Sequence, residues 1–251
     1  MTTSAAVRPR LLYIAAFAWL SVTGGRFLAP FLEHQANFSD AGLVGSVLAC
    51  QTTVSSLLGS VGGSWADARQ VLYPNKGRAQ VMFAGVAIGS AAFLSHGAGM
   101  LFHTIPLFRT TQWHFVLRIA WACSCSLVMP VLDGMTLAHL EKTPGMNPAD
   151  YGKERLYGAI AWAIVNLIMG PILDTFGFVA LYPIAMMVTV AFFICIGLYV
   201  NGQDEEEEEE ALSHELVSQQ NEIAFTLIQR QEHDESTCKD HSMMEGSIPI
   251  P

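Results

Sequence analysis

Runs of about twenty apolar residues constrain this chain more than any other feature. A helix needs roughly twenty such residues to cross about 30 Å of hydrocarbon. Only 14% of the 251 residues are charged, against roughly 25% in soluble domains. The sequence therefore predicts an all-α, polytopic membrane protein. Six transmembrane helices are expected, at Leu11–Leu32, Ala41–Trp65, Gln80–Phe102, Trp113–Leu140, Tyr157–Phe176 and Val179–Val200.

Charge divides the chain into three parts. Residues 1–10 form a short polar leader, 11–202 a mildly basic six-helix bundle, and 203–251 a strongly acidic tail with six consecutive glutamates. The leader lacks a small-residue cleavage site, so we expect it to flank the first span rather than to be a removable signal peptide. Repulsion within the glutamate run, and the shortage of apolar partners around it, predict a mostly disordered tail.

Basic residues between the spans lie mostly on one side. If the N-terminus is cytosolic, the segments on that side hold eight Lys or Arg residues, whereas the opposite turns hold only Arg109. Cytosolic loops are enriched in Lys and Arg. We therefore expect both termini in the cytosol, with the 1–10 leader and the 203–251 tail on the same side; the sequence leaves open which membrane is spanned.

Two arginines fall within the predicted spans, at similar depths in the outer half. Ionisable groups at such depths are costly unless they are paired or face water, and they are functional candidates by default. Arg26 and Arg118 together fit a clamp for a carboxylate or phosphate, because the planar guanidinium matches these groups bidentately. Alternatively, Arg26 pairs with Glu33 or Asp174, and Arg118 reaches outward to the headgroups.

Asp133 lies near the cytosolic end of the fourth span, just after a helix break expected at Pro130. Two roles fit this carboxylate. It carries a proton during transport, or it anchors the neighbouring loop by accepting hydrogen bonds from Arg155 or Arg69.

Chemistry at a bound metal or cofactor is not expected. The spans present no cluster of His, Cys or carboxylate residues with the spacing of a metal site or of a catalytic site. The sequence thus predicts no metal, no cofactor, no enzymatic activity and no nucleic-acid partner.

Two stretches carry a family resemblance. GSWADAR, at 63–69, is followed by Lys76 and Arg78 and resembles the loop signature of the major facilitator superfamily. YGKERLYGAIAW, at 151–162, followed by Gly170-x-x-x-Asp174, resembles the opening of the fifth span in the lactose permease-like and nucleoside-proton symporter-like branch. Asp133 also fits the fourth span of that branch.

The resemblance implies one six-helix half of a secondary transporter that moves a small solute by alternating access, commonly with protons. In such a carrier, Arg26 and Arg118, singled out by their depth, and Asp133 would line the aqueous pathway for solute and protons. The resemblance adds Asp174. It places the cytosolic gate at two groups of residues. One group is Gly63, Asp67 and Arg69, with Asp67 accepting from Arg69 or, alternatively, from Lys76 or Arg78. The other is Tyr151, Gly152, Arg155 and Gly158.

A carrier of this family has two six-helix halves with the substrate site between them. This sequence supplies the N-terminal half, so three explanations are open. The chain is a truncated form, it pairs with a second half or with its own copy, or it has lost transport. The competing hypothesis is a membrane adaptor that works through its acidic cytosolic tail.

Overall fold

The computed structural model describes residues 3–35, 38, 40–74, 76–102, 104–143, 145–203, 212 and 216–220. It separates into two compact units, residues 1–202 and 203–251. Most of the second unit lies outside the described residues. The tail for which disorder was predicted therefore also lies mostly outside them. The helices of the first unit are α1 (Thr3–Gly24), α2 (Leu28–Gln35), α3 (Ala41–Leu72), α4 (Gly77–Leu94), α5 (Ala98–Leu101), α6 (Thr111–Lys142), α7 (Tyr151–Phe176) and an unlabelled last helix at 181–203.

The prediction of six membrane-spanning helices is confirmed. Within the described part of the chain, six helical segments are long and apolar enough to cross a membrane, and no strand occurs. The first of these segments is interrupted at residues 25–27, where α1 ends and the short α2 begins. Helix α1 starts at Thr3, so the expected polar leader is already largely helical.

Helices α3, α6 and α7 extend beyond their predicted ends, α3 at its C-terminal end to Leu72, α6 at both ends and α7 at its N-terminal end to Tyr151. Asp40 accepts a hydrogen bond from the Gly42 amide and caps α3, and the Thr110 hydroxyl accepts from the Trp113 amide and caps α6. Helix α7 begins at Tyr151 and ends at Phe176. The next residue, Gly177, has a φ of 70°, which suits glycine. The GSWADAR stretch consequently lies inside α3 and not in a loop.

The expected helix break at Pro130 is wrong, because α6 continues through it from Thr111 to Lys142. Proline has no N–H, so the carbonyl of Ser126, four residues earlier, loses its intrahelical donor. Gly62 of α3 lies directly against this carbonyl, where an added Cβ would be only 2.2 Å from the oxygen. The absence of a side chain at Gly62 thus permits close packing of α3 on α6.

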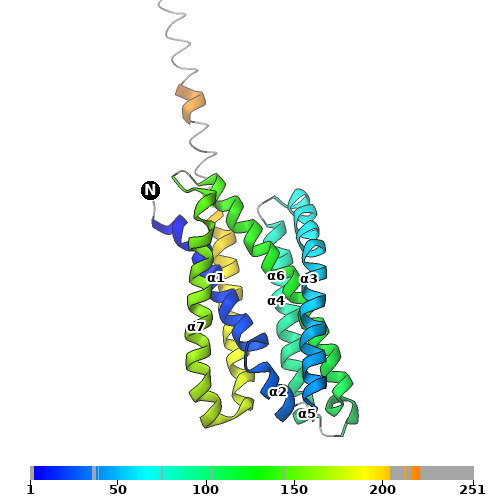
Figure 1. The fold of residues 1–251 in the computed structure, drawn as a ribbon. Coiled ribbons are helices and arrows are strands. Elements are labelled where there is room, and N and C mark those ends of the chain that lie inside the picture. The colour runs from blue at the N-terminus through cyan, green and yellow to red at the C-terminus, as the bar shows by residue number, and fades with distance from the viewer. Residues whose placement is uncertain are drawn as a thin grey trace, which may run out of the picture. The chain divides into compact units, whose positions relative to one another are not determined.

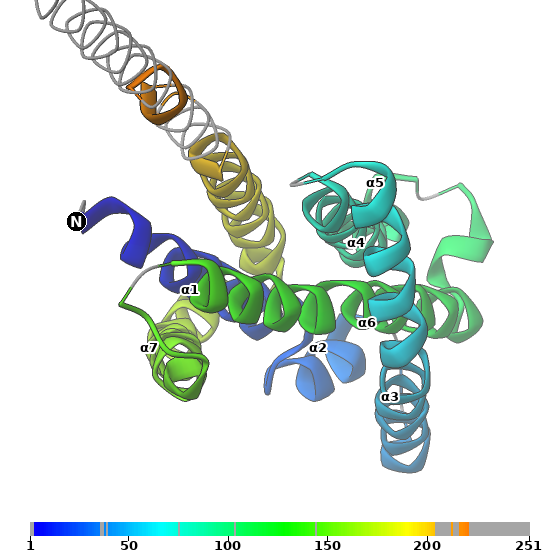
Figure 2. The same cartoon turned by 90° about the horizontal axis from the view of Figure 1, so that it is seen from above.

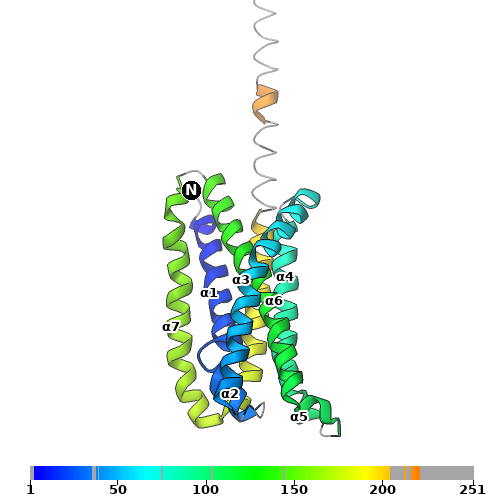
Figure 3. The same ribbon diagram turned by 45° about the vertical axis from the view of Figure 1, so that its right-hand side comes forward.

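Helix α6 is the centre of the bundle. It packs along α3 and α4 and also touches α1 and α7, while α1 packs mainly against α7 (Figure 1). The view from above has α1 and α7 on one side and α3 and α4 on the other, with the tilted α6 passing between them (Figure 2). The N-terminus lies at one end of the bundle, and α2 and α5 lie at the opposite end (Figure 3).

Aromatic contacts and hydrogen bonds fix the last helix to its neighbours. Phe193 stacks on Phe83 of α4 with ring centroids 4.2 Å apart. Thr189 shares a 2.8 Å hydrogen bond with Ser90, which in turn accepts from the indole of Trp19. This chain of donors and acceptors satisfies buried polar groups of α1, α4 and the last helix at once.

Candidate functional site

Arg118 is the most deeply buried charged residue that the structure describes, with no exposed surface. Its Nε and Nη2 atoms donate to Oε1 of Gln51 at 3.1 and 2.7 Å, and its Nη1 atom donates to the carbonyl of Thr23 at 2.8 Å. The guanidinium therefore joins α6 to α3 and α1. The alternative in which Arg118 reaches outward to the headgroups is wrong, because the side chain points into the bundle.

Trp121 completes the surroundings of this guanidinium. The Arg118 Cζ atom lies 4.2 Å from the centre of the Trp121 ring, within the range of a cation–π contact. The indole of Trp121 donates to the Thr23 hydroxyl, which donates to the carbonyl of Trp19. We call Arg118, Gln51, Thr23 and Trp121 the arginine core.

The positive charge of Arg118 has no carboxylate partner among the described residues. All of its described hydrogen-bond acceptors are neutral oxygens, and no carboxylate of the described residues forms an ion pair with Arg118. A cation at this depth costs about 2.5–3.5 kcal/mol on insertion scales. Neutral oxygens and the tryptophan face offset part of that cost, and an anion arriving from outside would offset more.

Arg26 differs from Arg118 in its environment. It lies in the break between α1 and α2 and is exposed, and it makes no hydrogen bond or ion pair with any described residue. The expected pairing with Glu33 or Asp174 is absent, and both of these carboxylates are exposed. The structure therefore does not join Arg26 to the arginine core by a direct contact, although Thr23 lies only three residues before it.

Asp133 has a partner that the sequence did not reveal. The buried Tyr13 of α1 donates its hydroxyl hydrogen to Asp133 Oδ1 at 2.7 Å. Arg155 donates to the hydroxyl of Tyr151 at 3.4 Å and acts on Asp133 electrostatically rather than by direct contact. Asp133 thus links α6 to α1 near the N-terminal end of the bundle, and neither Arg155 nor Arg69, the donors expected for it, forms a described hydrogen bond to it.

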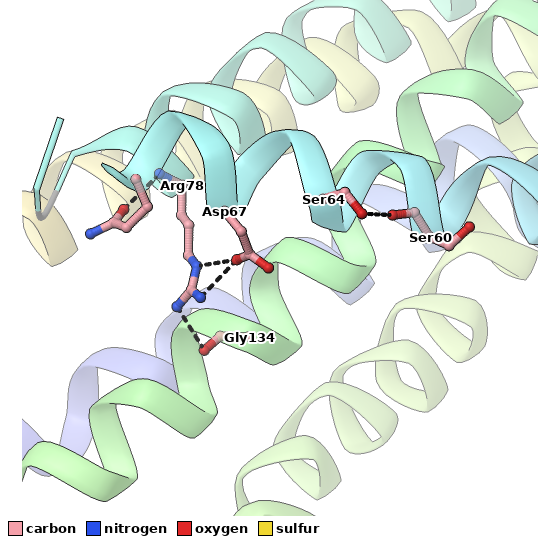
Figure 4. A network of polar contacts seen from close by, with 6 residues as sticks. Ser60, Ser64, Asp67, Arg78 and Gly134 are labelled. Atoms are coloured by element: carbon pink, nitrogen blue, oxygen red, sulfur yellow. Dashed lines mark hydrogen bonds and ion pairs between the residues drawn. The ribbon is translucent and has the colours of Figure 1, made fainter. Parts of the chain in front are cut away.

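Among the basic partners that the resemblance offers for Asp67, the structure has Arg78 and not Arg69. Asp67 Oδ1 accepts from Nη2 and Nε of Arg78, at 2.7 and 3.0 Å, and Arg78 also reaches the carbonyl of Gly134 on α6 at 3.4 Å (Figure 4). Arg69 instead stacks over Tyr73 at 4.4 Å. The reason is geometric: residues 67 and 69 lie two apart on one helix and point in different directions.

A further ion pair joins the first and fifth spans at the same end. Nε of Arg10 donates to both carboxylate oxygens of Glu154, the shorter contact being 2.9 Å, and Nη2 adds a third bond of 3.0 Å. The Glu154 side chain is only 6% exposed. Arg10 also lies over the ring of Tyr157, at 5.0 Å from its centre. Sequence reasoning missed this pair, since 144 positions separate its members.

The remaining predicted residues have varied surroundings. Gly158 packs so closely on Phe17 that a Cβ would lie 2.6 Å from that ring. Gly63 has only an ordinary contact to Pro130, and Gly152 faces open space. Within the described residues, no group of three or more potential ligands could hold a metal ion.

The comparisons with known proteins give one match. The profile of the MFS_1 like family matches residues 10–241, which include all six spans. Neither a curated protein nor a solved structure matches the chain. The match favours a transporter over an enzyme and leaves the lactose permease-like branch a prediction. With most of its length covered by this profile, the chain belongs to the MFS_1 like family and is an integral, multi-pass membrane protein of the major facilitator superfamily.

Proposed function

We propose that the protein is a secondary active transporter that moves a small organic anion, together with protons, by alternating access. The family match supports transport. The observation that carries the substrate class is the arginine core, where Arg118 is fully buried among neutral acceptors only. A guanidinium binds carboxylate and phosphate groups bidentately, so the solute carries one of these groups.

The contacts near the N-terminal end of the bundle are the proposed gate. Three of them join different helices: Asp67 with Arg78, Glu154 with Arg10, and Asp133 with Tyr13. In the proposed cycle, gate contacts form in one conformation and break in the other, as the helices at this end move apart. In the proposed orientation this end is cytosolic, and epitope tags at either terminus are expected to be accessible only from the cytosol.

We further propose that a second six-helix bundle, either a separate half or another copy of this chain, lies against α3 and α7. The most apolar part of α3 is only 11% buried, the lowest share of the six spans, and those of α7 and the last helix are each 28% buried, against 56% for α6. The hydroxyls of Thr52, Thr53 and Ser55 on α3 bond to carbonyls of their own helix, so this surface can meet an apolar partner. The molecular mass of the detergent-purified protein distinguishes a single copy from a pair.

Proton-coupled transport can be measured in proteoliposomes that contain a pH-sensitive dye. We expect that external citrate or glucose 6-phosphate acidifies the interior, that a protonophore abolishes the signal, and that Arg118→Gln removes it. Lactose and uridine, which lack an anionic group, are the neutral controls. A response to the neutral solutes alone would contradict the anion assignment, and a protein that responds to none of the four would contradict the proposed transport of these solutes.

A further inference from the structure

Two buried histidines meet at the end of the bundle opposite the N-terminus. His96 lies in a 3-10 helix (Ser95–Gly97) that continues α4, and His114 lies in the first turns of α6. They are 4% and 2% exposed. Their Nδ1 atoms are 2.7 Å apart, and the rings are nearly parallel, with an interplanar angle of 3°. The proposed transport does not require this contact.

The Nδ1–Nδ1 distance limits how many protons the pair can hold. A neutral imidazole has one N–H donor and one bare nitrogen, so a hydrogen bond between two Nδ1 atoms requires that one carries hydrogen and the other does not. One excess proton can be added at a bare Nε2 without disturbing this bond. A second excess proton places hydrogen on both Nδ1 atoms, and the contact must then open.

The pair has little polar help from its neighbours. Nε2 of His96 and the hydroxyl of Tyr182 are buried without hydrogen-bond partners among the described residues. Phe31 of α2 and Phe93 of α4 stand edge-on to His96, with centroids 5.5 and 6.1 Å away. An excess positive charge is therefore poorly solvated while the contact stays closed.

The other charged or titratable groups near the pair do not compensate for that charge. Arg118 lies one turn after His114 on α6 and is itself positive. On α2, Glu33 is exposed and His34 stacks on Phe178 instead of His96. The last helix contributes Tyr182, which packs against Phe31.

We propose that the His96–His114 pair is a proton-binding site at which acid opens the contact between α4 and α6. The closed pair holds at most one excess proton, whereas the separated, hydrated rings hold one each. By linkage, acid therefore favours the open form. Below the usual histidine value of about 6.5, the open form holds one or two more protons than the closed pair, so each pH unit favours opening by about tenfold or more.

Hydrogen–deuterium exchange of the full chain in lipid nanodiscs tests this site without reference to transport. After correction for intrinsic rates, we expect protection in residues 91–102 and 111–118 to fall about tenfold or more between about pH 6 and about pH 5. The double variant His96→Asn/His114→Asn, which has no imidazole left at this site to take up a proton, should lose this dependence, and each single variant should weaken it. His34→Asn, at an exposed histidine of the same end, should retain it.

Three results would overturn the proposal. One is a wild-type protein whose protection in these segments does not change with pH, and another is an asparagine variant that keeps the full pH dependence. The third comes from the wild-type protein alone and applies even if these variants fail to fold. Nitrogen-15 spectra of its histidines at about pH 8 should contain one ring protonated at Nδ1, and two Nε2–H rings at this pair would exclude the hydrogen bond.

Discussion

Replacement of Gly62 by alanine tests the packing of α3 on α6 directly. The new Cβ would lie 2.2 Å from the Ser126 oxygen, 3.0 Å from its carbonyl carbon and 3.4 Å from Leu127 Cα. All three are backbone atoms, so no rotamer change can relieve the clash. The two helices must separate by at least about 1 Å, because non-bonded atoms are most stable at about 3.5–4.0 Å.

Two terms decide the size of the effect. Overpacking of this kind costs about 1–3 kcal/mol, and alanine in place of glycine inside a helix returns up to about 1 kcal/mol. Because the three contacts are with backbone atoms, the overpacking cost should lie in the upper part of this range, at about 2–3 kcal/mol, and we expect Gly62→Ala to destabilise the bundle by a net amount of about 1–2 kcal/mol. Gln51 lies three turns earlier on the same helix, so the displacement should also weaken its hold on Arg118.

The matched control is Gly59→Ala, one turn away on the same helix. Its Cβ would meet only Pro130 Cγ, at an ordinary contact distance of 3.7 Å. This variant should be unchanged or more stable by up to about 1 kcal/mol. Unfolding of both variants in one detergent, followed by tryptophan fluorescence, gives the comparison. A Gly62→Ala protein as stable as the wild type, or an equal loss in both variants, would refute the packing argument.

Two further predictions concern contacts near the N-terminal end of the bundle. Glu154→Gln removes the charge that holds Arg10 and should cost about 1.5–3 kcal/mol in the same unfolding assay. Lys153→Gln, at an exposed ion pair, should leave the unfolding midpoint nearly unchanged. Equal effects of the two changes would contradict the burial of Glu154. Tyr13→Phe removes the hydroxyl that donates to Asp133 and should also cost about 1.5–3 kcal/mol, and an unchanged midpoint would mean that this hydrogen bond contributes nothing.

The spans could be predicted from the sequence because they depend only on length and apolarity, which are local properties. The same is true of the depth of Arg118. The continuity of α6 through Pro130 could not be predicted in this way, because the surroundings of the proline, such as Gly62 against the Ser126 carbonyl, come from distant segments of the chain. A proline in a single helix, taken alone, favours a break.

The partners in the site were harder to predict than its charged residues. Gln51 is a polar residue inside an apolar span, and that signal could have identified it. The Thr23 carbonyl gives no sequence signal, since every residue has one. Arg10 and Glu154, like Tyr13 and Asp133, come from spans far apart in the chain, and only the folded bundle reveals that they meet.

The most direct test of the arginine core is whether an anion stabilises the protein through Arg118. Thermal unfolding of the wild type should shift upward with citrate or glucose 6-phosphate, because a ligand at a hundred times its Kd adds about 2.7 kcal/mol. Arg118→Gln should fold and show no shift. An equal shift in this variant, or no shift in the wild type with either anion, would contradict the assignment of Arg118 as the anion-binding residue.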